Sequence, residues 1–246
     1  MENTNTMMTN NEPALSLDDI LNYEAPSTGS SSRFKLETDV YNAIIKCLYI
    51  TEAATGTEIT HIVFEANGVE KDLSLYTSFK GTKNHTKIDE KTGKATSTPD
   101  YIKIAKLCYL LTGKVINNSP VETKAIQVMD WASKGKKIIQ VPCYSEMINK
   151  PVKIALEQHE RFKSERNAQG VYVQTQETFT SYEINDFYDI TSSQNAKEKA
   201  GGLEAKAMNT WLASNKGKVF KEKAQSVAPA AAAQPATNNV AVTSLF

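Results

Sequence analysis

An Asn-Gly pair between two alternating segments constrains the fold of this chain more than any other sequence feature. Residues 58–65 and 69–77 both have the composition and the two-residue alternation of β-strands. Asn67 and Gly68, which lie between them, tolerate positive φ at both central positions of a two-residue turn. The sequence therefore predicts an antiparallel hairpin at this point.

Other segments extend this prediction to a mainly β protein with a few helices, an α+β fold. Thr98 as N-cap and Pro99 at the first helical position predict the start of a helix that ends at Gly113. Further strands are expected at 41–50, 125–131, 137–141 and 152–158, and Pro142 is expected to end the third of these. Residues 178–190 are expected to form a strand or a packed loop, and residues 203–214 a helix. Several strands with one inserted helix suit an OB-fold-like antiparallel barrel.

The composition divides the chain into three parts. Residues 1–33 are polar and acidic and end in a run rich in Pro, Ser and Gly, which predicts a flexible N-terminal extension. Residues 34–223 hold the predicted strands and helices and are expected to form one domain. Residues 224–246 are rich in Ala and Pro, which predicts a disordered tail. A helical turn from Ser16 in the extension is either an acidic docking peptide or part of an ordinary terminus.

Several protein classes find no support in the sequence. It contains no apolar run of membrane-spanning length and no N-terminal secretion signal, so a cytosolic protein without a membrane partner is expected. There is no glycine-rich phosphate loop, nucleophile elbow or zinc-binding spacing, so we expect neither an enzyme nor a metal or cofactor. His61 is expected to be a half-buried strand residue. The three cysteines are far apart in apolar surroundings, which favours reduced thiols: Cys47, Cys108 and Cys143.

The charges are segregated although the formal net charge is zero. Residues 1–40 carry seven acidic and two basic residues, whereas residues 80–114 carry eight lysines and three acidic residues. This asymmetry predicts a basic face and an acidic segment that could compete for it. The alternative is that each charged run is only a solvated surface.

The basic segment also contains aromatic residues at its borders. A single-stranded nucleic acid needs lysines for its phosphates and aromatic faces for its unpaired bases. The candidate nucleic-acid-binding residues are therefore Tyr76, Phe79, Lys80, Lys83, Lys87, Lys91, Lys94, Tyr101 and Lys103. The alternative is a soluble lysine-rich hairpin with Tyr76 or Tyr101 in the core.

Several runs resemble a bacteriophage family of single-stranded DNA-binding proteins. They are residues 75–78, the Lys83-Asn84 loop, the turn at 89–94, Pro99 with Tyr101 at a helix start, 105–108 and 111–114, and the resemblance extends from about Leu36 to the Trp211 helix. It implies an OB-fold protein without catalytic residues. Such a protein coats and protects DNA strands during phage replication, recombination or repair, largely independently of sequence, in the cytoplasm of the infected bacterial host.

The sequence departs from this resemblance at two places. His85 and Thr86 stand where relatives would carry aromatic residues, and no acidic residue follows Glu222 although the chain keeps Leu245 and Phe246 at its tip. The terminal tails remain the candidate route to replication or recombination proteins. A monomer is expected. Two other classes stay open: a phage strand-annealing or recombination accessory protein, and a non-catalytic structural or interaction module.

Overall fold

In the computed structural model of the chain, the predicted Asn-Gly hairpin is formed by β2 (Glu58–Ala66) and β3 (Val69–Tyr76). The two strands pair antiparallel from Ala66 opposite Val69 to Ile59 opposite Tyr76. Both turn residues have the positive φ that this turn requires, 51° at Asn67 and 72° at Gly68. The prediction of this hairpin is confirmed.

The structure describes residues 35–130, 135–168 and 170–223. The expected extension 1–33 and tail 224–246 lie outside the described residues. The described residues from Leu36 to Lys223 belong to one compact unit by their contacts. The remaining elements are β1 (Asp39–Glu52), β4 (Thr86–Ile88), β5 (Ala95–Ser97), α2 (Pro99–Thr112), the 3-10 turn η1 (Ile116–Asn118), β6 (Val121–Asp130), β7 (Gly135–Tyr144), the 3-10 turn η2 (Ser145–Met147), β8 (Pro151–Arg166), β9 (Tyr172–Tyr188), α3 (Ala196–Ala200), α4 (Ala207–Asn215) and β10 (Val219–Lys221).

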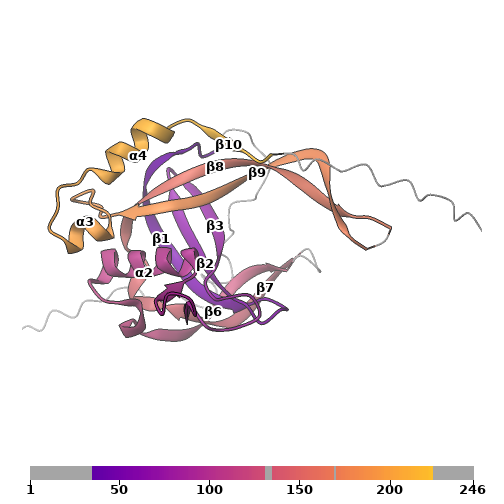
Figure 1. Cartoon of the computed structure of the whole chain (residues 1–246), viewed down its shortest axis with the longest axis horizontal. Coiled ribbons are helices and arrows are strands. Elements are labelled where there is room, and N and C mark those ends of the chain that lie inside the picture. Colours follow the sequence, from indigo (N-terminus) through magenta and orange to yellow (C-terminus); the bar gives the residue numbers. More distant parts are fainter. Residues whose placement is uncertain (1–34, 131–134, 169, 224–246) are drawn as a thin grey trace, which may run out of the picture. The chain divides into compact units, whose positions relative to one another are not determined.

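Strand β1 lies at the centre of the main sheet (Figure 1). One edge of β1 pairs with β2 along residues 43–52. Its other edge pairs with β8 along residues 39–44 and meets β7 where Tyr49 lies opposite Cys143. β6 pairs with β7, and β9 pairs with β8. All these pairings are antiparallel, whereas β10 pairs with β8 in parallel.

The mainly β, α+β prediction is confirmed, because 51% of the described residues are in strands and 19% in helices. The predicted barrel, however, is not closed. Closure would require β3 to pair with another strand, but among the described strands β3 pairs only with β2. Strand β8 cannot supply that pairing because β1 and β10 occupy one of its edges and β9 the other. A seam therefore remains between the free edges of β3 and β9.

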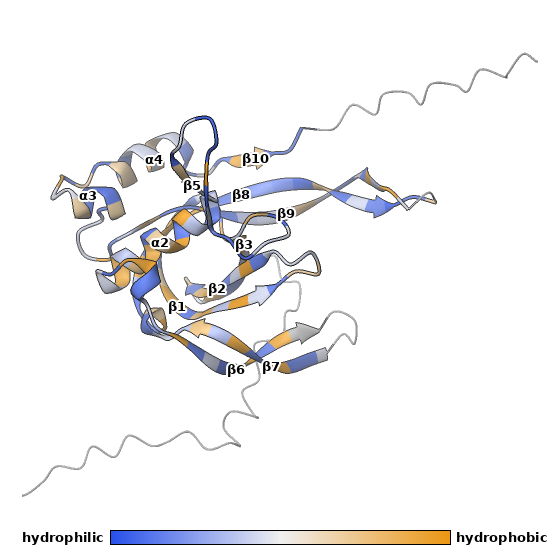
Figure 2. Cartoon of the chain, turned by 60° about the horizontal axis from the view of Figure 1, so that its bottom comes forward, coloured by the Kyte–Doolittle hydropathy of each residue, from blue (hydrophilic) through white to orange (hydrophobic). Residues whose placement is uncertain are grey.

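Two apolar clusters lie on opposite faces of β1 and β2. The inner cluster contains Ile45, Leu48, Ile62 and Phe64, against which α2 packs Leu107. The outer cluster, formed where the β6–β7 hairpin covers part of the other face, joins Tyr49, Val141 and Cys143 to the partly buried residues Cys47, Val63, Ile126, Val128 and Ile139. Figure 2 shows this hairpin as a layer separate from β2 and β3.

The predicted basic hairpin also forms. β4 and β5 pair antiparallel through three residue pairs and are connected by a turn, in which Asp89 Oδ1 accepts hydrogen bonds from the backbone amides of Lys91 and Thr92. The chain then enters α2 as predicted: the Thr98 side chain accepts a hydrogen bond from the Tyr101 amide, and Gly113 ends the helix with φ 73°.

One strand end differs from the prediction. Pro142 does not stop its strand, because β7 continues to Tyr144 with Pro142 opposite Thr123. The region 178–190, expected as a strand or a packed loop, belongs mostly to β9. Beyond Phe162, β8 and β9 pair only with each other and form a long two-stranded arm (Figure 1).

None of the helices in the described part of the chain has the length and apolar composition needed to cross a membrane.

Candidate nucleic-acid interface

The β6–β7 hairpin covers only part of the outer face of β1, β2 and β3, and two adjoining hollows remain beside it. The first, about 600 Å³, is lined by Tyr49, Thr51, His61, Asp72, Ser74, Val128 and Ile139. The second, about 400 Å³, is lined by Ile50, Thr51, Glu52, Glu58, Lys83, Ile139, Gln140, Val141 and Pro142. Because Thr51 and Ile139 line both hollows, they form one continuous surface, which we call the outer groove.

The floor of the outer groove contains an aromatic stack. The rings of Tyr49 and His61, which are directly opposite each other on β1 and β2, have centroids 4.4 Å apart and planes 4° from parallel. His61 Nε2 shares a hydrogen bond with Thr51 Oγ1 at 2.8 Å, and Nδ1 shares one with Ser74 Oγ at 3.1 Å. Hydrogen bonds at both nitrogens fix the plane of the imidazole ring.

A carboxylate lies beside this stack. The Tyr49 hydroxyl donates a hydrogen bond to Asp72 Oδ2 at 3.1 Å, and Asp72 Oδ1 lies 3.6 Å from His61 Nδ1. Burial raises the pKa of the Tyr49 hydroxyl, and the charge of Asp72 raises it further. The hydroxyl therefore stays protonated and remains a donor to Asp72. The Asp72 side chain is 50% exposed, so its oxygens are also open to a ligand.

One lysine lines the outer groove, and further exposed lysines lie on the β4–β5 and β6–β7 hairpins. On the β4–β5 side, Lys83 lines the groove and pairs with Glu52 at 2.7 Å. Four exposed lysines of the same segment form no ion pair with any described residue: Lys80, Lys87, Lys91 and Lys94. On the β6–β7 side, Lys136 and Lys137 are exposed, and their side chains likewise form no ion pair within the described ranges. These six lysines hold charge that no described carboxylate pairs with.

Two predicted aromatic residues pack within the basic segment. The Lys87 ammonium lies 4.6 Å from the centroid of the Phe79 ring, which is a cation–π contact. Tyr101, which is half-buried, stacks on His85 with ring centroids 4.5 Å apart and donates its hydroxyl to Asn117 Oδ1. The Tyr101–His85 stack thus joins the basic segment to α2, whereas the Phe79–Lys87 contact lies within that segment.

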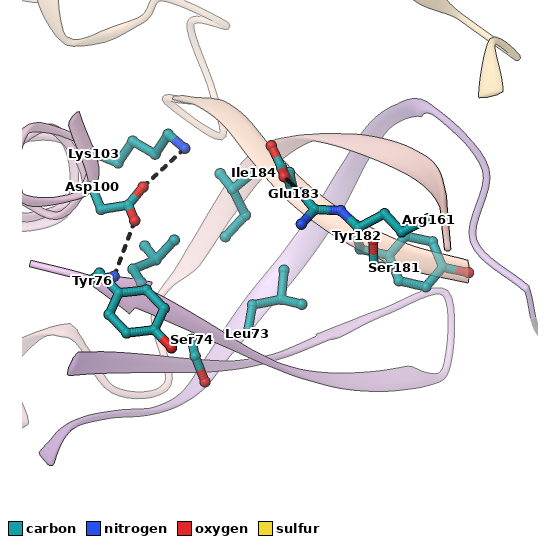
Figure 3. Close-up of a pocket in the computed structure, with 11 residues that line it drawn as sticks. Leu73, Ser74, Tyr76, Asp100, Lys103, Arg161, Ser181, Tyr182, Glu183 and Ile184 are labelled. Atoms are coloured by element: carbon teal, nitrogen blue, oxygen red, sulfur yellow. Dashed lines mark hydrogen bonds and ion pairs between the residues drawn. The ribbon is translucent and has the colours of Figure 1, made fainter. Parts of the chain in front are cut away.

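Tyr76, Lys103 and three charged neighbours meet at the open seam between β3 and β9 (Figure 3). The seam encloses a pocket of about 270 Å³. The Tyr76 amide donates to Asp100 Oδ2 at 3.0 Å, and Lys103 Nζ donates to Asp100 Oδ1 at 3.2 Å. Arg161 and Glu183 form an ion pair on the β9 side. Lys103 is therefore already paired, whereas the Tyr76 side chain is 57% exposed.

One group of side chains has the composition of a metal site. The possible ligand atoms of Glu157, His159 and Glu183 lie within 4.8 Å of one another on β8 and β9. Asn185 donates to Glu157, and Arg161 pairs with Glu183, so both carboxylates already have partners. This arrangement is that of a surface charge network around His159.

Of the predicted residues, Lys83 lines the outer groove, and Tyr76 and Lys103 line the seam pocket. The residues on the floor of the groove were not among the predictions.

Tyr49 lies within an apolar strand, and the sequence does not reveal which face of that strand a second hairpin covers. His61 was predicted as a half-buried strand residue, which is confirmed by an 18% exposed side chain, but its stacking on Tyr49 was not predicted. The signal that was present is the alternation along β2, which places His61 on the face opposite Ile62 and Phe64.

No family model matches the chain, and no curated protein matches it.

Proposed function

We propose that this chain is a single-stranded DNA-binding protein that coats unpaired strands largely independently of sequence. The observation that carries the proposal is the outer groove, whose aromatic floor lies beside the β6–β7 hairpin, where Lys136 and Lys137 pair with no described carboxylate, and whose second hollow is lined by Lys83. Aromatic faces stack with unpaired bases of any type, and lysines follow the phosphates of the strand. The groove offers both kinds of contact on one surface.

The aromatic floor favours a single strand over a duplex. In a duplex the faces of the bases are covered by their neighbours, and a protein reaches only the base edges in the grooves. The His61 ring and the exposed Tyr76 ring can gain stacking energy only from bases that are free of a partner. The lysines would contact the phosphates of either form of DNA. The preference for a single strand therefore comes from the aromatic floor of the outer groove.

The unpaired lysines account for binding despite the zero net charge of the chain. A lysine that already pairs with a carboxylate must lose that contact before it binds a phosphate. Lys80, Lys87, Lys91 and Lys94 form no such pair with the described residues, so they can neutralise phosphates without this cost. Their spacing along a hairpin allows several of them to contact one strand.

The biological setting follows from the sequence resemblance described above. We propose that the protein protects strands exposed during phage DNA replication, recombination or repair, in the cytoplasm of the infected bacterial host. In this role it acts as a monomer, without catalytic residues, metal or cofactor. Replication or recombination proteins would reach it through the terminal segments 1–33 and 224–246.

Fluorescence anisotropy tests the proposed function directly. The full-length protein is titrated into a labelled mixed-sequence single strand of about 20 nucleotides and into the duplex of the same sequence, at low salt. We expect the single strand to bind at least about tenfold more tightly than the duplex, because only unpaired bases reach the groove floor. Equal affinity for both forms, or no binding to either, would contradict the proposal.

A further inference from the structure

The aromatic stack in the outer groove ends at His61. Tyr49, His61 and Ser74 lie directly opposite one another on β1, β2 and β3, and so form one row across the sheet. The first two positions carry rings that are 4° from parallel. The third carries a serine, which is too small to cover the second face of the imidazole. A flat ring above Ser74 would therefore continue the stack.

The neighbours of Ser74 along β3 determine what the edge of such a ring would meet. Side chains alternate between the two faces of a strand, so Asp72 and Tyr76 are on the same face as Ser74 and on either side of it. A ring that continues the stack has its plane parallel to the axis of β3 and perpendicular to the sheet. One edge of this ring therefore points along β3 toward Asp72. The Asp72 side chain is 50% exposed and its oxygens can only accept hydrogen bonds when ionised.

The contacts of Asp72 with described residues leave part of its hydrogen-bond acceptor capacity unused. A carboxylate offers about four lone-pair sites. The Tyr49 hydroxyl occupies one at 3.1 Å, and His61 Nδ1 approaches the other oxygen only to 3.6 Å while it bonds to Ser74 at 3.1 Å. Asp72 lines the first hollow of the groove together with the apolar residues Val128 and Ile139. An acceptor beside an apolar wall selects for a ligand that donates there.

We infer that Asp72 selects an amino-bearing base, with cytosine preferred over uracil or thymine, for the slot above Ser74. This inference rests on the proposed function and adds a base preference at one position of the bound strand. Cytosine presents its N4 amino group as a donor to a carboxylate. Thymine and uracil present a carbonyl at that position, and its oxygen would be repelled by the Asp72 carboxylate.

Two oligonucleotides that differ only in this group test the inference. Oligo(dC) and oligo(dU) of about 20 nucleotides have the same ring size and neither has a methyl group, so a difference in affinity reports the amino group. We expect the full-length protein to bind oligo(dC) roughly fivefold to tenfold more tightly, the size of one good base-edge contact. In Asp72→Asn the two affinities should agree within about twofold, because an amide can both donate and accept.

Glu70→Gln is the matched control, because it removes a carboxylate from the same strand at an exposed residue that does not line the groove. Its preference for oligo(dC) should be unchanged, which separates base selection from a general gain in positive charge. Equal binding of oligo(dC) and oligo(dU) by the unmodified protein would overturn the inference but leave the proposed function intact. A preference that persists in Asp72→Asn would also overturn it. Failure to bind either oligonucleotide at low salt would instead overturn the proposed function.

Discussion

The backbone amide of Tyr76 donates a hydrogen bond to the Asp100 carboxylate, at 3.0 Å, where a closed barrel would place a neighbouring strand. Asp100 of helix α2 thus supplies the hydrogen-bond acceptor for the last backbone amide of β3. This contact therefore stabilises a free strand end through the backbone of Tyr76, a residue that is 57% exposed at the border between the sheet and the basic hairpin. The ring is available for a ligand because the backbone, and not the side chain, makes the structural contact.

Tyr76→Ala should weaken binding to a single strand without unfolding the protein. Loss of one stacked base costs about 1 to 3 kcal/mol, and the backbone bond to Asp100 is kept in the variant. Tyr172→Ala is the control, because Tyr172 is 72% exposed on the β8–β9 arm. Anisotropy titrations and thermal melts of both variants separate the outcomes. A large drop in the melting temperature of Tyr76→Ala would assign Tyr76 to packing.

The salt dependence of binding should fall when the unpaired lysines of the basic hairpin are removed. Each phosphate contact on a single strand contributes about 0.7 to the slope of log K against log salt. A variant with Ala at positions 80, 87, 91 and 94 should therefore lose up to about three units of slope. The control variant replaces four exposed lysines of the α3–β10 region: Lys197, Lys206, Lys218 and Lys223. A similar loss of slope in both variants would show that the contacts are not localised.

Cys47 should react slowly with thiol reagents although it is only partly buried. Burial raises the pKa of the Cys47 thiol to about 12, with the neighbouring Cys143 contributing next. Since the thiolate is the reactive form, the folded protein should be alkylated at least about a hundredfold more slowly at pH 8 than the protein in urea. Mass spectrometry after timed labelling measures this rate. Fast labelling of Cys47 in the folded protein would contradict the burial of its sulfur between β1 and β7.

Asp189 should contribute stability that is lost in acid. Burial alone would raise the pKa of this carboxyl, but hydrogen bonds from Lys199 and from the amides of Ser192 and Thr191 lower it to about 2. The charged form is the one that folding favours, so its contribution is complete above a pH of about 4 and disappears toward pH 2. Asp189→Asn should thus lower the melting temperature at pH 7 by an amount corresponding to about 1 kcal/mol, and much less at pH 2.5. A deficit that is the same at both pH values would contradict this assignment.

The parts of the fold that were predicted correctly depend on local sequence. The Asn67-Gly68 turn needs positive φ at both positions, and the Thr98-Pro99 pair caps and starts α2, so each feature is determined by two adjacent residues. The open seam could not be predicted in this way. It results from the pairing of β8 with β1 and β10, which are both far from β8 in the sequence, in addition to β9, which follows β8.

Candidate site residues could be predicted only where they are close together in the sequence. The lysines of the basic hairpin are close together in the sequence, so their charge could be recognised from composition. The floor of the groove joins Tyr49 of β1 to His61 of β2 and to Ile139 of β7, and these residues meet only in the folded sheet. Tyr49 also lies in a strand with apolar contacts on both faces, which hid the difference between its core face and its groove face.

Photocrosslinking tests the location of the bound strand most directly. A mixed-sequence single strand in which 5-iodo-deoxycytidine replaces deoxycytidine is irradiated with the full-length protein, and the crosslinked peptides are identified by mass spectrometry. We predict crosslinks in the peptides that contain His61 and Tyr76, together with residues of the β4–β5 hairpin. Crosslinks confined to the β8–β9 arm or to α3 and α4 would contradict binding in the outer groove.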